Sequence, residues 1–156
     1  MAGASPGARA GVTAAAARSE AARRFFEAEA ERIARLCHAM AERFAAGGRL
    51  IAAGASPAGR SDARHVAVEF VHPVIVGKRA LPALAVEPEK VALYAEPDDI
   101  VIAFAAVGAE HELHVPTEDP FIAQEQIETA YHVLWELVHV FFEHRGLLSG
   151  LSLIHI

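Results

Sequence analysis

The sequence contains one cysteine, Cys37, and fewer basic than acidic side chains, and each shortage excludes a class of protein. A single cysteine excludes an intramolecular disulfide and a cysteine-rich zinc site, and it fits a reducing compartment. With 14 Lys and Arg against 20 Asp and Glu, the formal net charge is −6, which leaves no basic stripe for nucleic acid or for an anionic membrane surface. We therefore expect no nucleic-acid partner.

Long hydrophobic runs are also missing. The most apolar segment, residues 133–142, is interrupted by Glu136 and His139, and it is shorter than the ~18 apolar residues that a membrane-spanning helix requires. Residues 1–18 contain Ala, Gly and two arginines but not the leucine-rich core of a signal peptide. We therefore expect a cytoplasmic protein with no membrane partner.

The residues that are present suffice for one packed domain. The chain has 156 residues, 53% of them hydrophobic and 22% charged, as is typical of a globular protein. Residues 1–17 are rich in Ala and Gly and carry few large side chains, so we expect a disordered leader. We assign the domain to 18–148 and treat 149–156 as a tail. Its last six residues, LSLIHI, resemble a translated sequencing adapter, and an ordinary apolar tail is the alternative.

Helical and strand patterns alternate along this domain. A helix over about 19–46 is predicted by one apolar stripe, which consists of Phe26, Ile33, Cys37, Met40 and Phe44. Further helices are predicted at 61–72, at 88–95 and from about 117 to 144, and short apolar runs predict strands at 49–53, 81–86 and 100–105. Ser61 and Asp62 are cap candidates for the second helix, and Thr117 for the last.

This order of elements indicates an α/β fold, in which helices cover an open, mainly parallel sheet and ligands gather at the carboxyl ends of the strands. The connection after the last predicted strand is unusually short. Residues 106–111 separate it from the segment 112–115, whereas a parallel crossover needs about a dozen residues. We therefore expect either a hairpin between the two segments or the deletion of one βα unit.

Four side chains on two predicted helices could carry chemistry. His65 and Glu69 are four residues apart, so they project from one helix face, where a solvated ion pair is the simplest interpretation. Gln124 and His132 are eight residues apart on the last helix, and His132 taken alone is a candidate for a core histidine with satisfied hydrogen bonds. Together the four could form a mixed nitrogen and oxygen site for zinc or a similar divalent ion.

Two segments carry a resemblance to a known family. The first is GGRLIAAGASPAGRSDARHVAVEFV, residues 47–71, in which Asp62, Ala63, His65 and Glu69 match a motif that follows a glycine-rich turn. The second is PTEDPFIAQEQIETAYHVLWELVHVF, residues 116–141, with a Gln-Glu pair at Gln124 and a histidine eight residues beyond it. Both resemble the phosphoheptose isomerase branch of the sugar isomerase (SIS) family. The stretch EFVHPVIVGKRALPALAV more weakly resembles SIS proteins encoded near hydrogenase genes in high-GC bacteria.

The resemblance implies a three-layer α/β/α sandwich of the flavodoxin-like kind, incomplete here, and a homo-oligomer, tetramer or dimer. It implies an isomerase that interconverts sedoheptulose 7-phosphate and its aldose isomer through an ene-diol. Glu69 and His132 would then be the catalytic acid and base, and zinc would be held by His65, Glu69, Gln124 and His132. The sugar phosphate would be bound by a set in and after the turn, namely Ser56, Arg60, Ser61 and Asp62.

The chain departs from the family pattern where the phosphate is bound. The turn reads GASPAGRS, with Ala55 in place of an expected Asn and with Pro57, which has no N–H to donate. Residues 100–115 contain no Ser or Thr, although the family has a phosphate-binding loop there that is rich in them. A non-catalytic SIS module that binds a sugar phosphate or serves in assembly is therefore the alternative to an enzyme.

Overall fold

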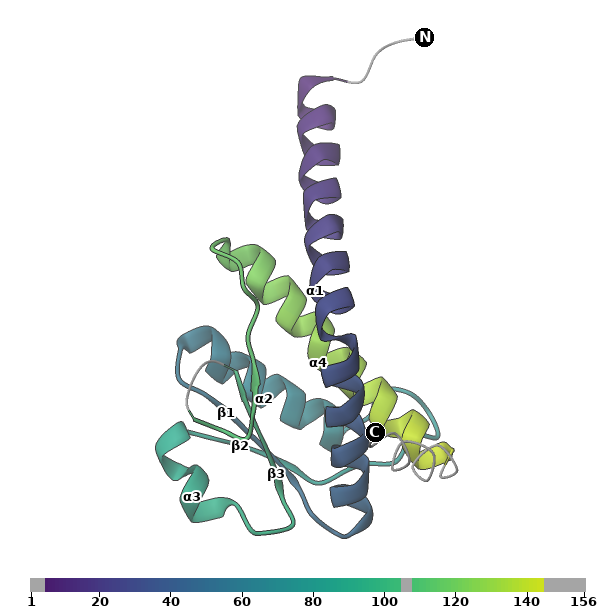
Figure 1. The fold of residues 1–156 in the computed structure, drawn as a ribbon, viewed down its shortest axis with the longest axis vertical. Coiled ribbons are helices and arrows are strands. Elements are labelled where there is room, and N and C mark those ends of the chain that lie inside the picture. Colours follow the sequence, from purple (N-terminus) through teal and green to yellow (C-terminus); the bar gives the residue numbers. More distant parts are fainter. Residues whose placement is uncertain (1–4, 105–107, 145–156) are drawn as a thin grey trace.

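A computed structural model describes residues 5–104 and 108–144 of the chain (Figure 1). Its elements are, in chain order, α1 (Pro6–Ala45), β1 (Leu50–Gly54), α2 (Pro57–Val71), β2 (Ala83–Val86), η1 (Pro88–Lys90), α3 (Val91–Tyr94), β3 (Ile100–Phe104), β4 (His111–Leu113) and α4 (Pro120–Glu143). The expected tail at 149–156 lies outside the described residues. Within them, no helix combines the length and the apolar character needed to cross a membrane.

The four strands form one parallel sheet in the order β2-β1-β3-β4. Leu50 of β1 is in register with Ala83 of β2 and with Ile100 of β3, so the central strand is paired along both edges. Both faces of β1 are buried, which explains why it is an unbroken apolar run of small and branched side chains. The prediction of an α/β sandwich with an open, parallel sheet is confirmed.

The connection between β3 and β4 corrects one expectation. β4 pairs parallel to β3, with His111 opposite Ile102, so the hairpin, one of the two alternatives, is wrong. The six residues suffice because β4 has only three residues and begins opposite the middle of β3. The chain therefore travels back by two residues of strand, about 7 Å, and not by the length of a whole strand. Residues 105–107 of this connection lie outside the described part of the chain.

The core lies on one face of the sheet, under α1, α2 and α4. Alternate residues of β1 and β3 point into it, and they meet Met40 and Phe44 of α1, Phe70 of α2 and Leu134 of α4. Phe44 stacks on Phe70 with ring centroids 5.6 Å apart. This packing fixes α2 and α4 side by side over the strands, and that placement brings their side chains together.

The opposite face of the sheet has a thin covering. Ile51, Leu84 and Val101 are in register there, and Leu84 is 36% exposed. The crossover from β2 to β3 runs back over β1, so a right-handed connection puts η1 and α3 on this face, where α3 packs on β1. The second helical layer thus consists of two short elements, while three helices cover the other face.

All three long helices begin at residues other than the predicted ones. α1 begins at Pro6, so most of the expected disordered leader is helical, because a helix satisfies its own backbone hydrogen bonds and alanine favours it without burial. α2 begins at Pro57, capped by Ser56, and α4 begins at Pro120, capped by Asp119. In each case a Ser or Asp cap precedes a proline at the first helical position, a combination that places the helix start.

Candidate functional site

The turn that leads from β1 into α2 is held by two glycines in direct backbone contact. A Cβ atom built on Gly54 would lie 2.1 Å from the carbonyl carbon and oxygen of Gly59. A Cβ on Gly59 would lie 2.4 Å from the carbonyl oxygen of Phe104, at the end of β3. The start of α2 therefore sits on the carboxyl ends of β1 and β3, and this close approach sets the position of the whole helix.

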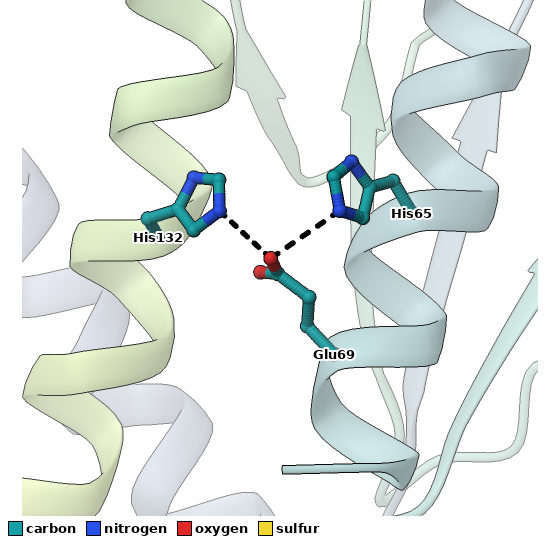
Figure 2. A group of neighbouring side chains, drawn as sticks. All are labelled: His65, Glu69 and His132. Carbon is teal, nitrogen blue, oxygen red and sulfur yellow. Dashed lines mark ion pairs between the residues drawn. The ribbon is translucent and has the colours of Figure 1, made fainter. Parts of the chain in front are cut away.

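Three side chains from α2 and α4 converge further along these helices (Figure 2). The Nε2 atom of His132 lies 2.8 Å from Oε1 of Glu69, and Nε2 of His65 lies 3.4 Å from the same oxygen. In the described part of the chain this is the one group of His, Cys, Asp or Glu side chains that could hold a metal ion. We call His65, Glu69 and His132 the central cluster.

Burial within the central cluster is uneven. The side chain of Glu69 is 18% exposed, while those of His65 and His132 are each 52% exposed. The interpretation of His132 as a buried core histidine is therefore wrong. Nor is the pairing of His65 with Glu69 a simple surface ion pair, because the carboxylate is largely buried and is shared with His132. Within residues 5–104 and 108–144, Oε2 of Glu69 is the one buried side-chain oxygen or nitrogen without a hydrogen-bond partner.

The second ring nitrogen of His132, Nδ1, also has a hydrogen-bond partner. Nδ1 of His132 lies 2.5 Å from the carbonyl oxygen of Glu128, and because a carbonyl can only accept, Nδ1 carries the proton. In a neutral His132 the bare Nε2 then faces a carboxylate oxygen, so two acceptors meet at 2.8 Å. Only a proton or a cation between them makes this contact favourable.

The geometry of the central cluster fits a zinc ion. Ligand atoms around a tetrahedral zinc lie about 3.3 Å apart, since its bonds to nitrogen and oxygen are about 2.0–2.2 Å long. The two separations at Glu69 Oε1, 3.4 and 2.8 Å, are close to this value, and the candidate ligand atoms all lie within 4.8 Å of one another. The carboxylate oxygen without a partner is a further unused ligand atom. The donor set of two imidazoles and one carboxylate suits zinc.

The predicted fourth ligand, Gln124, lies two turns from His132 on α4. Its Nε2 donates to Oδ1 of Asp62 at 2.6 Å and to Oε1 of Glu128 at 3.2 Å. Asp62 is itself buried on α2. Burial raises the pKa of Asp62 and nearby Glu128 adds to the rise, while the hydrogen bond from Gln124 opposes it. Gln124 thus joins α4 to α2 through Asp62, and its role as a metal ligand stays a prediction.

The four residues predicted to bind the sugar phosphate lie in different places in the structure. Ser56 and Asp62 line a hollow of about 270 Å³ between α2, α4 and the ends of β3 and β4. Ser56 Oγ also accepts from the backbone N–H of Gly59 at 2.9 Å, as the cap of α2. Arg60 instead lines a small pocket beside β2 and donates to the carbonyl oxygen of Ala55 at 2.5 Å. Ser61 is exposed on α2.

An apolar pocket of about 180 Å³ opens beside the central cluster. Its lining includes Glu69 and His132 together with Val74, Ile75 and Trp135. The indole N–H of Trp135 donates to the backbone carbonyl of Glu69 at 3.0 Å, so this side chain ties the end of α2 to α4. The described lining holds no lysine or arginine, and a charged phosphate would find no cation in this pocket.

Two residues of the site were missed in the sequence. Glu128 lies midway between Gln124 and His132, at spacings of four, and this periodicity was the available signal. Tyr131, whose hydroxyl oxygen lies 2.9 Å from Nδ1 of His65, is hidden in the sequence because it also belongs to the apolar stripe of α4.

Comparisons with known proteins add a likeness of fold. No protein-family model matches the sequence, and no curated protein matches it significantly. Among solved structures, a phosphoheptose isomerase from Francisella tularensis superposes with a TM-score of 0.57 at 18% sequence identity, over 69% of this chain and 84% of the other. At that identity the likeness shows a shared fold, so this chain has the architecture seen in that isomerase.

Proposed function

We propose that this chain is a phosphosugar aldose–ketose isomerase of the sedoheptulose 7-phosphate type. The observation that carries the proposal is the convergence of His65, Glu69 and His132, from two helices far apart in the sequence, on one carboxylate oxygen. The family resemblance assigns Glu69 and His132 to acid–base catalysis, and it assigns all three side chains to the metal. The shared fold with a phosphoheptose isomerase supports the same reaction class.

The central cluster suits proton transfer beside a carbonyl group. Isomerisation of a ketose to an aldose moves a proton between adjacent carbons through an ene-diol, which requires one group to remove a proton and another to protonate an oxygen. Glu69 and His132 are 2.8 Å apart, so a proton accepted by one is within reach of the other. The bond from His132 Nδ1 to the carbonyl of Glu128 directs its Nε2 toward Glu69.

We propose that zinc is held by His65, Glu69 and His132, with Gln124 as the predicted fourth ligand. A bound zinc ion would polarise the adjacent substrate oxygens and stabilise developing negative charge. A carboxylate that binds the metal tightly is not free to move a proton. Oε1 of Glu69 meets both histidines while the buried Oε2 has no partner, which supports a division of roles between the two oxygens.

The hydroxyl-bearing part of the sugar would lie in the hollow lined by Ser56 and Asp62. A buried carboxyl suits the hydroxyl groups of a sugar, while Arg60, the one cation of the predicted set, lines the separate pocket beside β2. We further propose a homo-oligomer, tetramer or dimer. The half-exposed imidazoles of the central cluster leave room for a neighbouring subunit to close the site.

A non-catalytic module that binds sugar phosphate, or that serves in assembly, is the second candidate. The specific observation that favours it is the lack of Ser and Thr in residues 100–115, together with Pro57 at the first position of α2. Both remove hydrogen-bond donors from the places where the phosphate would be held. This candidate predicts ligand binding or self-association without turnover.

Zinc analysis of the purified chain and an isomerisation assay with sedoheptulose 7-phosphate test the proposal. We expect a stoichiometric metal and measurable turnover, and we expect Glu69→Gln and His132→Gln each to lower kcat by about 10²–10⁴-fold. Glu118→Gln is the matched control, because this exposed glutamate lies before α4 and outside the central cluster. Folded protein that binds no metal and has no turnover would refute the isomerase and leave the non-catalytic module.

A further inference from the structure

Tyr131 is the buried neighbour of the central cluster. Its side chain has no exposed surface, and its ring packs edge-on against Phe104 at a centroid distance of 5.9 Å. The same ring contacts both imidazoles, with centroids 5.4 Å from His65 and 5.0 Å from His132. Within the described residues, its hydroxyl forms one hydrogen bond, with Nδ1 of His65 at 2.9 Å.

The hydroxyl of Tyr131 stays protonated. Burial raises the pKa of this phenol well above its usual range, and the nearby carboxylates Glu128, Asp62 and Glu69 raise it further. A neutral phenol can both donate and accept a hydrogen bond, whereas the carbonyl partner of His132 can only accept. The two imidazoles are therefore held differently. The carbonyl partner fixes the tautomer of His132, whereas the tautomer of His65 can change when a cation binds.

We propose that Tyr131 is a positioning residue that holds the ring of His65 with Nε2 toward Glu69 and matches its tautomer to the presence of a cation. Without a cation, the phenol donates to Nδ1, and the Nε2–H of His65 faces the carboxylate. When Nε2 binds a divalent cation, Nδ1 carries the proton and donates to the phenol oxygen. The ring loses one proton to water at Nε2 and gains one from water at Nδ1, so the exchange needs no other co-reactant.

The contact between Tyr131 and His65 does more than fill the core. A buried tyrosine needs a hydrogen-bond partner in any protein, but many partners would serve that purpose. Here the partner is Nδ1 of His65, the ring nitrogen opposite the candidate ligand atom Nε2. Orienting partners of this kind commonly change metal affinity by about 10–100-fold. The part of the inference that concerns a cation rests on the proposed function, while the orientation of His65 is independent of it.

Long-range ¹H–¹⁵N spectra test the orientation, because they identify the protonated nitrogen of each imidazole. The chain has nine histidines, so His65→Gln assigns the relevant signals. At pH about 8, above the ordinary pKa of histidine, we expect His65 of the zinc-free protein to be one tautomer, with the proton on Nε2. A mixture of tautomers in the wild-type spectrum would overturn the proposal, whether or not any variant folds.

Tyr131→Phe then removes the hydroxyl and keeps the packed ring. We expect the His65 signals to become those of a tautomer mixture, and the zinc Kd, measured by competition with a chelator, to rise about 10–100-fold. Tyr94→Phe is the matched control, since it removes the hydroxyl of the only other tyrosine, which lies on α3. Unchanged His65 signals in folded Tyr131→Phe would refute the inference. Wild-type protein that shows the single tautomer but binds no zinc would refute the metal site and leave the orientation intact.

Discussion

Adding one methyl group at Gly54 forces β1 and α2 apart. The new Cβ would lie 2.1 Å from the carbonyl group of Gly59 and 2.6 Å from the backbone nitrogen of Arg60. Favourable carbon contacts begin at about 3.5 Å, so the two backbones must separate by roughly 1.4 Å. Because backbone atoms have no alternative rotamer, we expect Gly54→Ala to cost about 3 kcal/mol, at the upper end of overpacking costs.

Thermal unfolding followed by circular dichroism measures this cost. At about 2–4 °C per kcal/mol for a chain of this size, Tm should fall by roughly 6–12 °C. The control is Gly11→Ala, because a Cβ there meets nothing within 4 Å and alanine favours the helix, so Tm should stay equal or rise slightly. Zinc affinity should fall in Gly54→Ala alone, since α2 carries His65 and Glu69. A loss below about 1 kcal/mol would show that the turn is not as tightly packed as described.

Two further predictions concern buried carboxyl groups. The pKa of buried Asp99 is lowered overall. Burial alone would raise it, but the hydrogen bonds from the Arg49 side chain and from two backbone N–H groups outweigh that effect. We expect Asp99→Asn to lower the free energy of unfolding by about 2–3 kcal/mol at pH 7. The stabilisation that Asp99 provides is present above about pH 4 and is lost as pH falls through its pKa in the folded protein. Equal acid-unfolding curves for both proteins would contradict this. Asp62 has a raised pKa, so its charged form is disfavoured in the folded protein. Asp62→Asn can still accept the hydrogen bond from Gln124, and we expect it to be more stable to urea than the wild type at pH 7. This advantage should disappear below about pH 4, where the wild-type carboxyl is neutral in both states. The same variant should bind sugar phosphate less well, and a less stable variant at pH 7 would refute the reasoning.

The sequence predicts most of the fold because hydrophobic periodicity and glycines mark the elements. The strands at 49–53 and 100–105 are within one residue of β1 and β3 over the described residues. Helix starts are harder, because Ser61 and Thr117 satisfy the local rule as well as Ser56 and Asp119 do. Only the proline that follows each true cap separates them. The pairing of β4 depends on distance in space, which strand length alone does not give.

The candidate site was predictable where chemistry and helical spacing agree. His65 and Glu69 share a helix face by their spacing, and His132 meets them because the core packs α2 beside α4. Gln124 was expected at the metal, but its amide is bonded to buried Asp62, a contact between helices that no local pattern encodes. The role of Tyr131 was not predictable for a similar reason, since an apolar stripe does not show that one of its members has a hydroxyl bonded to His65.

The hydrogen bond from Trp135 to the backbone of Glu69 gives the protein an intrinsic optical reporter. The chain has one tryptophan, and its indole lies in the lining of the apolar pocket, against the helix that carries the carboxylate. Its ring centroid is also 4.3 Å from that of His139. Tryptophan fluorescence from the unlabelled protein, excited where tyrosine does not absorb, therefore comes from a single known position next to the central cluster. Occupancy of the site can be followed by titration in solution, without a dye and without a turnover assay.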